Sequence, residues 1–310
     1  MAKNNFSDFK VWCTELHSLF TIPQGAKPKA TEIKKYERLV NSEKEKTQEE
    51  IEYINTVSKK LEYLKTEPLS KTTISALMRQ YGWKVYNKKV AANGSDPLLF
   101  LKKGTDMEEE AAELLSKIDK VKYTREVETR ENTHIIGRCD IFNPGKIIDT
   151  KISWNVNAFL KARTTPLSKR HWYQMQGYME LYDVNQAEVV FLLLNTPPEL
   201  IEREKVKLQT RFMIGEIDRD KYELDMENIE SAFTYSNIPL KRRYFKFKVA
   251  REKQIFEKIY KKIDNARVWM EQFEKDMKTN IFVVPSEKYL ETEKNNTEFD
   301  SHGSSENDSE

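Results

Sequence analysis

The sequence contains few cysteines and few histidines, and each shortage excludes a class of protein. Among 310 residues there are two cysteines, Cys13 and Cys139, and four histidines. Two cysteines cannot supply the disulfide framework of a small secreted protein, so they indicate a reducing compartment. They also exclude a four-cysteine zinc or iron–sulfur site within one chain. Three of the histidines, His17, His134 and His302, form no set with metal-ligand spacing.

Long apolar runs are also absent from the sequence. No segment approaches the roughly 18 consecutive apolar residues that a membrane-spanning helix needs. The first twenty residues, "MAKNNFSDFKVWCTELHSLF", lack the continuous apolar core and the small-residue cleavage site of a secretory signal. We therefore expect a cytoplasmic protein with no membrane partner.

Charge is nearly balanced overall but unevenly distributed. The net charge is +2, with 33% charged and 38% hydrophobic residues, which describes a modest core under a heavily charged surface. From Glu287 onward there are eight acidic residues and two lysines, a sum of −6, so residues 1–286 carry +8. A basic body with an acidic tail is compatible with a polyanionic partner, although many solvated surfaces carry such a sum.

The N-terminal part of the chain reads as a charged helical extension, residues 1–68. Within residues 27–67, which are rich in Lys and Glu, apolar residues recur at steps of three and four, which predicts a helix with one apolar stripe. These residues are Ile51, Ile54, Val57, Leu61 and Leu64. Such a helix is expected to pack on the core or pair with its neighbour; a partner-docking arm is the alternative.

A short helix and a loop follow this extension. Ser70 or Thr72 is a candidate cap for a helix that ends near Gly82. The pairs at residues 93–94 and 96–97, Asn-Gly and Asp-Pro, mark turns, and a further helix is expected to begin near Asp106.

The middle and the end of the chain alternate between strand and helix patterns, which predicts an α/β (α+β) fold with a mixed β-sheet flanked by helices. Three β-rich runs cover residues 122–129, 133–142 and 145–153, and the turn at residues 143–145 joins the last two as a hairpin. Then come a helix over 168–184 capped by Ser168, a doubly buried strand over 187–195, a helix over 197–213, a strand over 242–250 and a helix over 251–277. Residues 286–310 are poor in apolar residues, which predicts a disordered acidic tail.

Charged residues interrupt the hairpin where strands usually carry Val or Ile. In "GRCDIFNPGKIIDTK", residues 137–151, Asp140 ends one apolar run, Asp149 ends the next and Lys151 follows. Strand alternation places Asp149 and Lys151 on one face. Two nearby carboxylates repel unless a cation lies between them, and Mg²⁺ suits carboxylate oxygens, waters and a substrate phosphate. The constellation therefore suits hydrolysis of a phosphodiester.

These residues carry a resemblance to a known family. "GRCD", eight residues, "DTK", twenty-two residues and "QMQGY" together resemble the PD-(D/E)XK nuclease superfamily, in the RecB-type branch with a Q-x-x-x-Y motif. Upstream, "KKGTDMEEEAAELL" resembles a helix of phage exonucleases of the lambda-exonuclease/YqaJ group. The likeness covers roughly Leu69 to Met277, and it implies a restriction-endonuclease-like core over residues 69–285.

The resemblance also implies roles for particular residues. Asp140 and Asp149 would be metal carboxylates, the carbonyl of Thr150 a further ligand and Lys151 the catalytic lysine. Glu108 would be the acid of the preceding helix, in a register that Glu109 and Glu110 leave open. Gln174 and Tyr178, four residues apart on one helix face, would brace the site. The metal would be Mg²⁺, with Mn²⁺ as an alternative. Cysteine, and not the proline of the family motif, precedes Asp140.

Basic and aromatic residues surround the loop between the catalytic strand and the motif helix, and they are candidates for DNA binding. Basic side chains contact phosphates, and aromatic side chains stack on unpaired bases. The candidates are Lys161, Arg163, Lys169, Arg170, Trp154 and Trp172. The alternative for each tryptophan is an ordinary core aromatic. His171 is expected to lie on the surface or contact DNA, since magnesium has little use for imidazole.

Three functions are consistent with the sequence. The first is a Mg²⁺-dependent deoxyribonuclease, an exonuclease that resects double-stranded DNA ends in phage-type recombination or repair. The resemblance then implies DNA, a single-strand annealing protein and further copies of the chain as partners, in the host cytoplasm if the protein is phage-encoded. A structure-specific or restriction-type endonuclease shares the chemistry. A non-catalytic nucleic-acid-binding or assembly protein is the alternative from another class.

Overall fold

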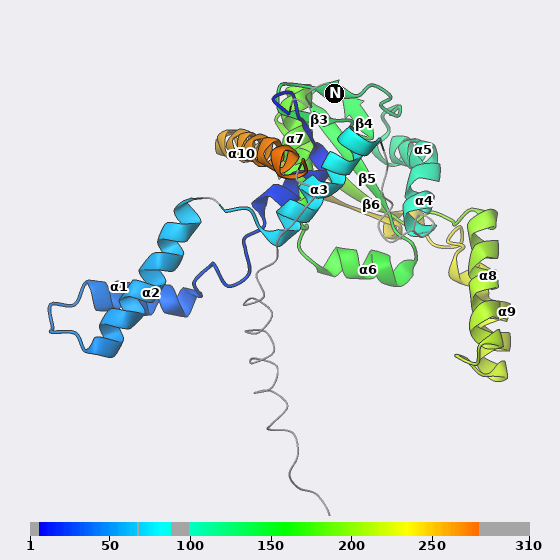
Figure 1. Ribbon diagram of the computed structural model, residues 1–310. Helices are drawn as coiled ribbons and strands as arrows, with labels where there is room; N and C mark the ends of the chain where they lie inside the picture. Colours follow the sequence, from blue (N-terminus) through cyan, green and yellow to red (C-terminus); the bar gives the residue numbers. More distant parts are fainter. Residues whose placement is uncertain (1–5, 67, 88–98, 279–310) are drawn as a thin grey trace, which may run out of the picture.

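The computed structural model describes residues 6–66, 68–87 and 99–278 and is built on a four-stranded sheet (Figure 1). The strands are ordered β4 (Ile141–Asn143), β5 (Lys146–Ile152), β6 (Gln186–Leu192) and β7 (Tyr244–Ala250). β5 pairs in parallel with β6, whereas the β4–β5 and β6–β7 pairs are antiparallel. The predicted mixed sheet of an α/β fold is therefore confirmed.

The hairpin between β4 and β5 fixes the register of the charged residues. Asn143 pairs with Lys146, so Pro144 and Gly145 alone form the turn. Gly145 has φ +89°, a conformation that residues with a Cβ rarely adopt. Along β5 the side chains alternate between two hydrophobic clusters, with Ile147 in one and Ile148 in the other. The strand is therefore covered on both faces.

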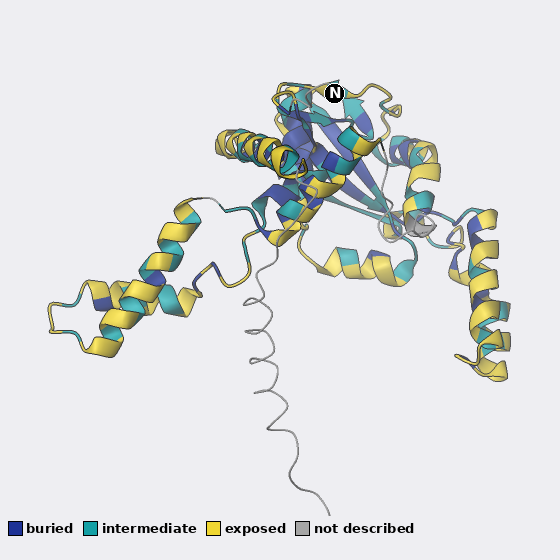
Figure 2. Ribbon diagram, viewed as in Figure 1, coloured by how far each residue is buried: buried dark blue, intermediate teal, exposed yellow. Residues whose placement is uncertain are grey.

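Helices cover both faces of this sheet (Figure 2). On one face lie α7 (Lys169–Tyr182) and α10 (Gln254–Asp276), whose buried side chains include Met175, Met179, Ile259 and Ile263. On the other face lies α5 (Glu108–Asp119), anchored by Met107, Ala111 and Leu115. Apolar residues at steps of three and four give each helix one face to bury, and that face determines which side of the sheet it covers.

The N-terminal segment belongs to the core, which differs from the prediction that residues 1–68 form an extension. It consists of β1 (Val11–Trp12) and the 3₁₀ helix η1 (Cys13–Phe20). β1 pairs in parallel with β3 (Ile135–Gly137), which pairs antiparallel with β2 (Arg130–Glu131). Phe6, Val11 and Leu16 are fully buried in the same cluster as α7. The predicted boundary is therefore wrong for residues 6–20.

Two glycines make room for this segment. A Cβ on Gly137 would lie 2.7 Å from Tyr178 Cε1 and 2.9 Å from Cys13 Sγ. A Cβ on Gly177 would lie 2.7 Å from Leu16 Cδ1 and 2.8 Å from Cys13 Sγ. Cys13 thus packs between β3 and α7 at positions where only glycine fits.

The charged stretch after the core segment forms a helical pair that projects from the body (Figure 1). Its helices are α1 (Ala30–Val40) and α2 (Gln48–Lys65). The predicted apolar stripe lies on α2, and Val57 is its buried residue. The Tyr53 hydroxyl donates to Glu32 O at 3.1 Å, and Lys60 Nζ lies 3.2 Å from Glu32 Oε1. The predicted pairing of a charged helix with its neighbour is therefore confirmed.

The next helices begin close to where they are predicted but differ in length. α3 (Lys71–Tyr86) starts after Ser70, whose hydroxyl accepts from Thr73 N at 3.0 Å. The helix continues past Gly82, its predicted end, as far as Tyr86, and Asn87 caps it with φ 51°. The predicted turns at residues 93–97 lie outside the described residues. α4 (Leu99–Asp106) is not predicted by the sequence pattern, and α5 begins two residues after the expected start.

Two of the three predicted β-rich runs differ from the structure. The run over 122–129 forms no strand. Its backbone is linked to the residue before β4 by a hydrogen bond from Glu126 N to Asp140 O at 2.7 Å. The run over 133–142 is divided into β3 and β4 by Arg138, Cys139 and Asp140. The interruption frees Asp140 from the strand ladder, so its side chain and carbonyl bond elsewhere.

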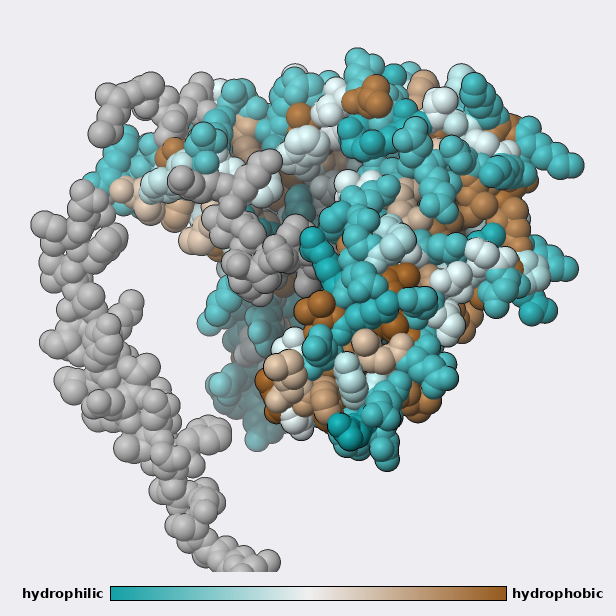
Figure 3. Space-filling model, turned by 90° about the vertical axis from the view of Figure 1, so that its right-hand side faces the viewer, coloured by the Kyte–Doolittle hydropathy of each residue, from teal (hydrophilic) through white to brown (hydrophobic). Residues whose placement is uncertain are grey.

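A second helical pair projects from the opposite side of the body (Figure 1). α8 (Pro198–Met213) is predicted, and α9 (Arg219–Ala232) is not; Phe212 and Tyr222 stack between them at 4.6 Å. Figure 3 faces this side and shows hydrophobic side chains scattered among hydrophilic ones. The remaining elements are α6 (Val156–Thr164) and the 3₁₀ helix η3 (Leu240–Arg242).

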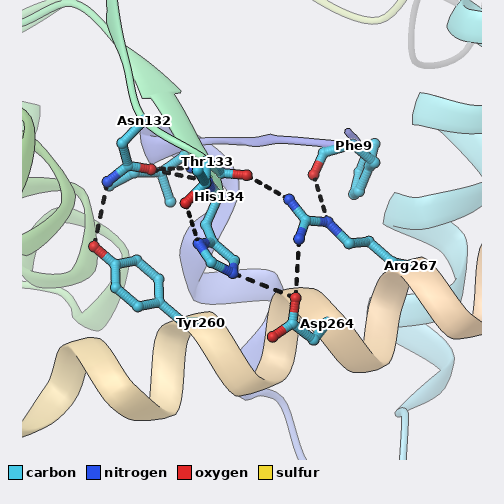
Figure 4. A network of polar contacts seen from close by, with 8 residues as sticks. Phe9, Asn132, Thr133, His134, Tyr260, Asp264 and Arg267 are labelled. Carbon is cyan, nitrogen blue, oxygen red and sulfur yellow. Dashed lines mark hydrogen bonds and ion pairs between the residues drawn. The ribbon is translucent and has the colours of Figure 1, made fainter. Parts of the chain in front are cut away.

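The last predicted strands and helix are confirmed by β6, β7 and α10, and a polar network ties α10 to the N-terminal segment (Figure 4). Arg267 donates through Nε to Phe9 O at 3.0 Å and through Nη1 to Asp264 Oδ1 at 2.9 Å. His134 Nε2 lies 3.3 Å from the same Asp264 oxygen. Residues 286–310, the predicted tail, lie outside the described residues. Among the helices in the described residues, none combines the length and apolar character needed to cross a bilayer.

Candidate active site

A cavity of about 720 Å³ lies at the end of β5. Its walls include residues of α4, α5, α7 and the N-terminal segment. All seven residues predicted for catalysis or metal binding line it: Glu108, Asp140, Asp149, Thr150, Lys151, Gln174 and Tyr178. The structure therefore gathers side chains that are up to 70 residues apart in sequence.

Asp149 is held by two partners. Its side chain is 1% exposed, and its Oδ2 lies 2.5 Å from Lys151 Nζ. Gln174 Nε2 donates to the other oxygen, Oδ1, at 3.1 Å. The strand alternation that places Asp149 and Lys151 on one face is therefore present, and α7 supplies the third side chain.

Asp140 is the most perturbed carboxyl group of the site. Thr150 donates to its Oδ2 twice, through the backbone N at 2.6 Å and through Oγ1 at 2.7 Å. Burial, followed by the nearby charge of Asp149, nevertheless raises the pKa of Asp140 to about 6. Burial, with repulsion from Asp149 added to it, therefore makes Asp140 harder to ionise.

Lys151 carries the opposite perturbation. Burial acts to lower the pKa of its ammonium group, but Asp149 and Asp140 outweigh burial and leave the pKa raised. The lysine is therefore a cation at neutral pH, and its charge partly offsets the repulsion between the two acids.

Glu108 lines the cavity from the first turn of α5, whereas Glu109 and Glu110 are exposed. Of the three neighbouring glutamates, Glu108 is therefore the one that lies at the cavity. Glu108 Oε2 lies 2.5 Å from Arg125 Nη2. Burial, and then the charge of Asp140, raise the pKa of the Glu108 carboxyl.

Three residues of the motif "QMQGY" on α7 make different contacts. Gln174 Nε2 donates to both Asp149 and the Tyr178 hydroxyl, the latter at 3.1 Å, so these two side chains form one hydrogen-bonded unit. Gln176 faces away from the cavity, donating to Ala250 O and accepting from Glu252 N, both at 2.9 Å. Gly177 accommodates the N-terminal segment.

The oxygen atoms of the site fit a hydrated divalent cation. Asp149 Oδ2 and Glu108 Oε2 are buried, and neither has a hydrogen bond within the described structure; each contacts one cationic side chain. The Thr150 carbonyl points toward Asp140, because the N–H and C=O of one strand residue face the same side. In the part of the chain that the structure describes, no group of three or more acidic, histidine or cysteine side chains is placed so that these side chains alone could hold a metal ion. Mg²⁺ ordinarily keeps several waters and needs only one or two carboxylates.

The residues predicted to bind DNA are dispersed. Arg170 lines the cavity, Lys169 is exposed at the start of α7, and Lys161 and Arg163 are exposed on α6. Both tryptophans pack partly against protein. Trp154 lies 5.2 Å from the Phe233 ring and Trp172 lies 5.0 Å from the Tyr173 ring, centroid to centroid. This packing limits the ring surface that the tryptophans can offer to a base.

Several cavity residues are absent from the sequence-based prediction. Arg138 stands two residues before Asp140, so strand alternation within "GRCD" could have found it. Trp12 in β1 and Thr14 in η1 carry no local signal. His171, expected from the sequence at the surface or against DNA, is partly buried and lines the cavity, and burial followed by the charges of Lys151 and Arg170 lowers its pKa to about 4. The imidazole is therefore neutral at neutral pH.

Comparison with solved structures places this arrangement in a known class of fold. The chain is similar to a phage-related exonuclease from Haemophilus somnus 129PT, with TM-score 0.57 and 23% identity over 87% of this chain and 97% of that chain. It also matches an alkaline exonuclease from Laribacter hongkongensis, with TM-score 0.48 and 10% identity over 88% and 93% of the two chains. No protein-family model and no curated protein matches the sequence. The predicted resemblance to phage-type exonucleases is thereby confirmed at the level of the fold.

Proposed function

We propose that the chain is a Mg²⁺-dependent deoxyribonuclease that degrades double-stranded DNA from its ends. One observation carries the proposal: two adjacent carboxylates, the buried Asp149 and the partly buried Asp140, share a cavity with a lysine ammonium group in the fold of a phage-related exonuclease. Placing two acids together in a partly desolvated site destabilises the protein, so their arrangement is more readily explained by a cation-dependent function than by stability.

The cation would be held by Asp140, Asp149 and the Thr150 carbonyl, with Glu108 as a further ligand or a holder of bound water. When bound, Mg²⁺ would supply a Lewis acid for the phosphate and lower the pKa of a water molecule. Mn²⁺ would be expected to substitute for it. Burial first, and then the charge of a neighbouring acid, raise the pKa values of Asp140 and Glu108, and a bound cation would offset both effects.

The chain's own side chains would then orient and stabilise the reacting phosphate. Lys151 presents an ammonium group to the cavity, where it stabilises the negative charge that develops on the phosphate. Gln174 fixes Asp149 so that its second oxygen keeps its direction, and Tyr178 fixes Gln174. This chain of contacts is a preorganised site of the kind that phosphodiester hydrolysis requires.

Arg138 and Arg170 support a polyanionic substrate. Both arginines line the cavity, Arg170 near Lys151 and Arg138 near Glu108. Arginine contacts phosphates through fixed pairs of N–H groups. The restriction to DNA ends comes from the likeness to phage exonucleases, as do the proposed partners, a single-strand annealing protein and further copies of the chain.

Cleavage of linear and covalently closed circular duplex DNA tests the proposal. We expect degradation of linear DNA alone, dependent on Mg²⁺, abolished by EDTA and lost in Asp149→Ala and Lys151→Ala. Removal of one transition-state donor such as Lys151 commonly costs at least about two orders of magnitude in rate. Cutting of closed circles would indicate an endonuclease. Binding without cleavage by the wild type would overturn the proposal in favour of a non-catalytic nucleic-acid-binding protein.

A second acid–lysine pair, which joins the end of α5 to β7, serves as the control. Lys246 Nζ lies 2.8 and 2.6 Å from the two carboxylate oxygens of Asp119, outside the cavity. Asp119→Ala and Lys246→Ala therefore remove a comparable ion pair without touching the site. Both variants are expected to retain cleavage within about threefold of wild type, since distant independent sites do not couple.

A further inference from the structure

The wall of the cavity that α4 forms is attached to the protein by a lysine. Of the α4 side chains that the structure describes, residues 101–106, only Lys103 is buried, and its exposure is 0%. Leu101 on the same helix is 56% exposed. A short helix of this kind ordinarily docks through apolar side chains, because its own hydrogen bonds stabilise it only marginally.

Lys103 makes two hydrogen bonds to consecutive carbonyl groups. Its Nζ donates to Ser153 O at 3.1 Å and to Trp154 O at 3.2 Å. It also lies 5.8 Å from the centroid of the Trp154 ring and 5.6 Å from that of Tyr235. Within the described residues no carboxylate lies in ion-pair contact with it, so carbonyl dipoles and ring faces stabilise the charge.

The two carbonyl groups belong to the end of the catalytic strand. Ser153 follows β5 directly, and its N donates to Leu192 O at the end of β6 at 2.8 Å. Asn155, two residues later, caps α6 by accepting from Ala158 N at 2.9 Å. Lys103 therefore joins α4 to a rigid corner two residues beyond Lys151.

The neighbouring helix α5 is anchored separately. Met107, Ala111 and Leu115 bury α5 against the sheet, so Glu108 does not depend on Lys103 for its position. Among the α4 residues whose side chains the structure describes, Leu101, Gly104 and Thr105 line the cavity, Lys103 makes the buried contact and Lys102 makes surface ion pairs. Met107 N also donates to Lys103 O at 3.2 Å, which links the two helices through the backbone. We therefore expect the loss of the Lys103 contact to loosen α4 more than α5.

We propose that Lys103 is a positioning residue that holds α4 against the cavity, so that this wall grips the substrate strand. The identity of the substrate rests on the proposed function; the anchoring does not. An apolar residue at this position would leave two carbonyl groups unpaired, at a cost of roughly 1–3 kcal/mol each. Burial lowers the pKa of Lys103 to about 8, so at neutral pH it still donates as an ammonium group.

The test compares Lys103→Met with Lys205→Met, which removes a lysine of α8 that lies outside the cavity and pairs with Glu202 and Glu230. Hydrogen exchange of the metal-free proteins is measured over residues 101–106 and 108–119. We expect Lys103→Met to accelerate exchange in 101–106 at least tenfold and to leave 108–119 within twofold of wild type. The control should change neither segment. Uniform acceleration of both segments, or of neither, would overturn the positioning role.

Substrate binding and turnover are measured in parallel. Affinity for a short DNA duplex in Ca²⁺, which blocks turnover in many Mg²⁺ nucleases, should fall at least fivefold in Lys103→Met. In Mg²⁺, KM should rise by a similar factor while kcat stays within threefold. A fall in kcat alone would contradict the proposal. If the wild type cleaves no DNA, the proposed function fails, and the exchange comparison still decides whether Lys103 anchors α4.

A milder variant, Lys103→Gln, keeps the proposal testable if Lys103→Met does not fold. Lys103→Gln keeps two N–H donors on a shorter, neutral side chain. It should fold and show exchange over residues 101–106 between those of wild type and Lys103→Met. Wild-type exchange over residues 101–106 in both variants would show that the position needs only bulk and would reject the role. If Lys103→Met does not fold, equal acceleration of residues 101–106 and 108–119 in Lys103→Gln would reject it.

Discussion

Asp140 accepts two hydrogen bonds from Thr150 through a single carboxylate oxygen. The backbone N of Thr150 lies 2.6 Å from Asp140 Oδ2, and its hydroxyl oxygen lies 2.7 Å from the same atom. The backbone donor is one that an uninterrupted strand would use in the ladder. The break between β3 and β4 thus converts a sheet hydrogen bond into a bond that orients a carboxylate. Thr150 therefore acts on Asp140 as well as offering its own carbonyl.

Replacing Thr150 with valine should weaken the site without unfolding the protein. The substitution keeps the side-chain shape and the backbone donor but removes the hydroxyl donor, whose bond favours the ionised form of Asp140. We expect the rate at pH 7 to fall about threefold to tenfold, which corresponds to the loss of one hydrogen bond. The acid limb of the pH–rate profile should move toward higher pH. Thr210→Val, on the exposed face of α8, is the control; an unshifted profile would show that the hydroxyl does not act on Asp140.

Asp140→Asn should stabilise the metal-free protein at neutral pH. The native state keeps the proton on Asp140 up to about pH 6, whereas the unfolded chain releases it near the ordinary value of 3.8. Between these values the native state binds more protons, so the free energy of unfolding falls as pH rises. A shift of roughly two pKa units corresponds to at most about 3 kcal/mol. Asparagine removes this loss and still accepts from Thr150.

Urea unfolding in EDTA at pH 4 and pH 7 measures this effect. The difference in unfolding free energy between Asp140→Asn and wild type should be larger at pH 7 than at pH 4. Glu108, whose pKa is also raised by burial and by Asp140, contributes to the wild-type slope in the same direction. Parallel curves for the two proteins would show that Asp140 does not resist ionisation.

Lys151→Ala should destabilise the metal-free protein as well as remove activity. Asp149 is 1% exposed, and Lys151 is the cation in contact with it, so the variant leaves a buried charge with Gln174 as its remaining partner. We expect a loss of about 1–3 kcal/mol, less than for a fully buried pair because Lys151 is 27% exposed. Adding Asp149→Asn should restore most of the loss in thermal unfolding. Additive losses in the double variant would show that the two side chains do not stabilise each other.

The pairs of site residues that lie on one strand or one helix could be predicted, because their spacing follows the repeat of that element. Asp149 and Lys151 share a face through the two-residue period of a strand, and Gln174 and Tyr178 share one through a four-residue step. Neither inference needs knowledge of what packs against the element. The hairpin was predictable for the same reason, since the Pro-Gly turn alone sets the register of β4 and β5.

The rest depends on contacts between distant segments. Trp12 reaches the cavity because β1 pairs with β3, more than 120 residues later, and no local pattern encodes that pairing. Lys103 reads as a surface residue because its buried carbonyl partners lie 50 residues away. Trp154 looks equally suited to DNA and to the core until Phe233 is placed beside it. Tertiary packing decides such residues, and local composition does not.

Gln174 and Tyr178 should act as one unit. Gln174 Nε2 donates to Asp149 Oδ1 and to the Tyr178 hydroxyl, both at 3.1 Å. Gln174→Leu removes both bonds and should lower kcat about tenfold or more, whereas Tyr178→Phe removes one bond and should lower it a few-fold. In the double variant the Tyr178→Phe effect should disappear, because its hydroxyl acts through Gln174. Multiplicative effects on kcat would mean that Tyr178 reaches the substrate independently.

Gly177→Ala should show that the N-terminal segment is part of the folded core. An added Cβ would lie 2.7 Å from Leu16 Cδ1 and 2.8 Å from Cys13 Sγ, and the segment would have to move. Overpacking of this kind destabilises by about 1–3 kcal/mol. Cys13→Ala removes the sulfur, so the double variant should recover part of the loss. The measurement is the free energy of unfolding in urea.

Gly82→Ala provides the matched control for that prediction. Gly82 also lies within a helix, α3, but a Cβ there would meet no heavy atom within 4 Å. Alanine favours the helix over glycine by roughly 0.5–1 kcal/mol, so this variant should be slightly more stable than wild type. Opposite signs for the two glycines follow only if Cys13 and Leu16 occupy the space beside α7. Equal stabilisation of both variants would mean that residues 6–20 do not pack there, and Trp12 and Thr14 would then lose their place in the cavity wall.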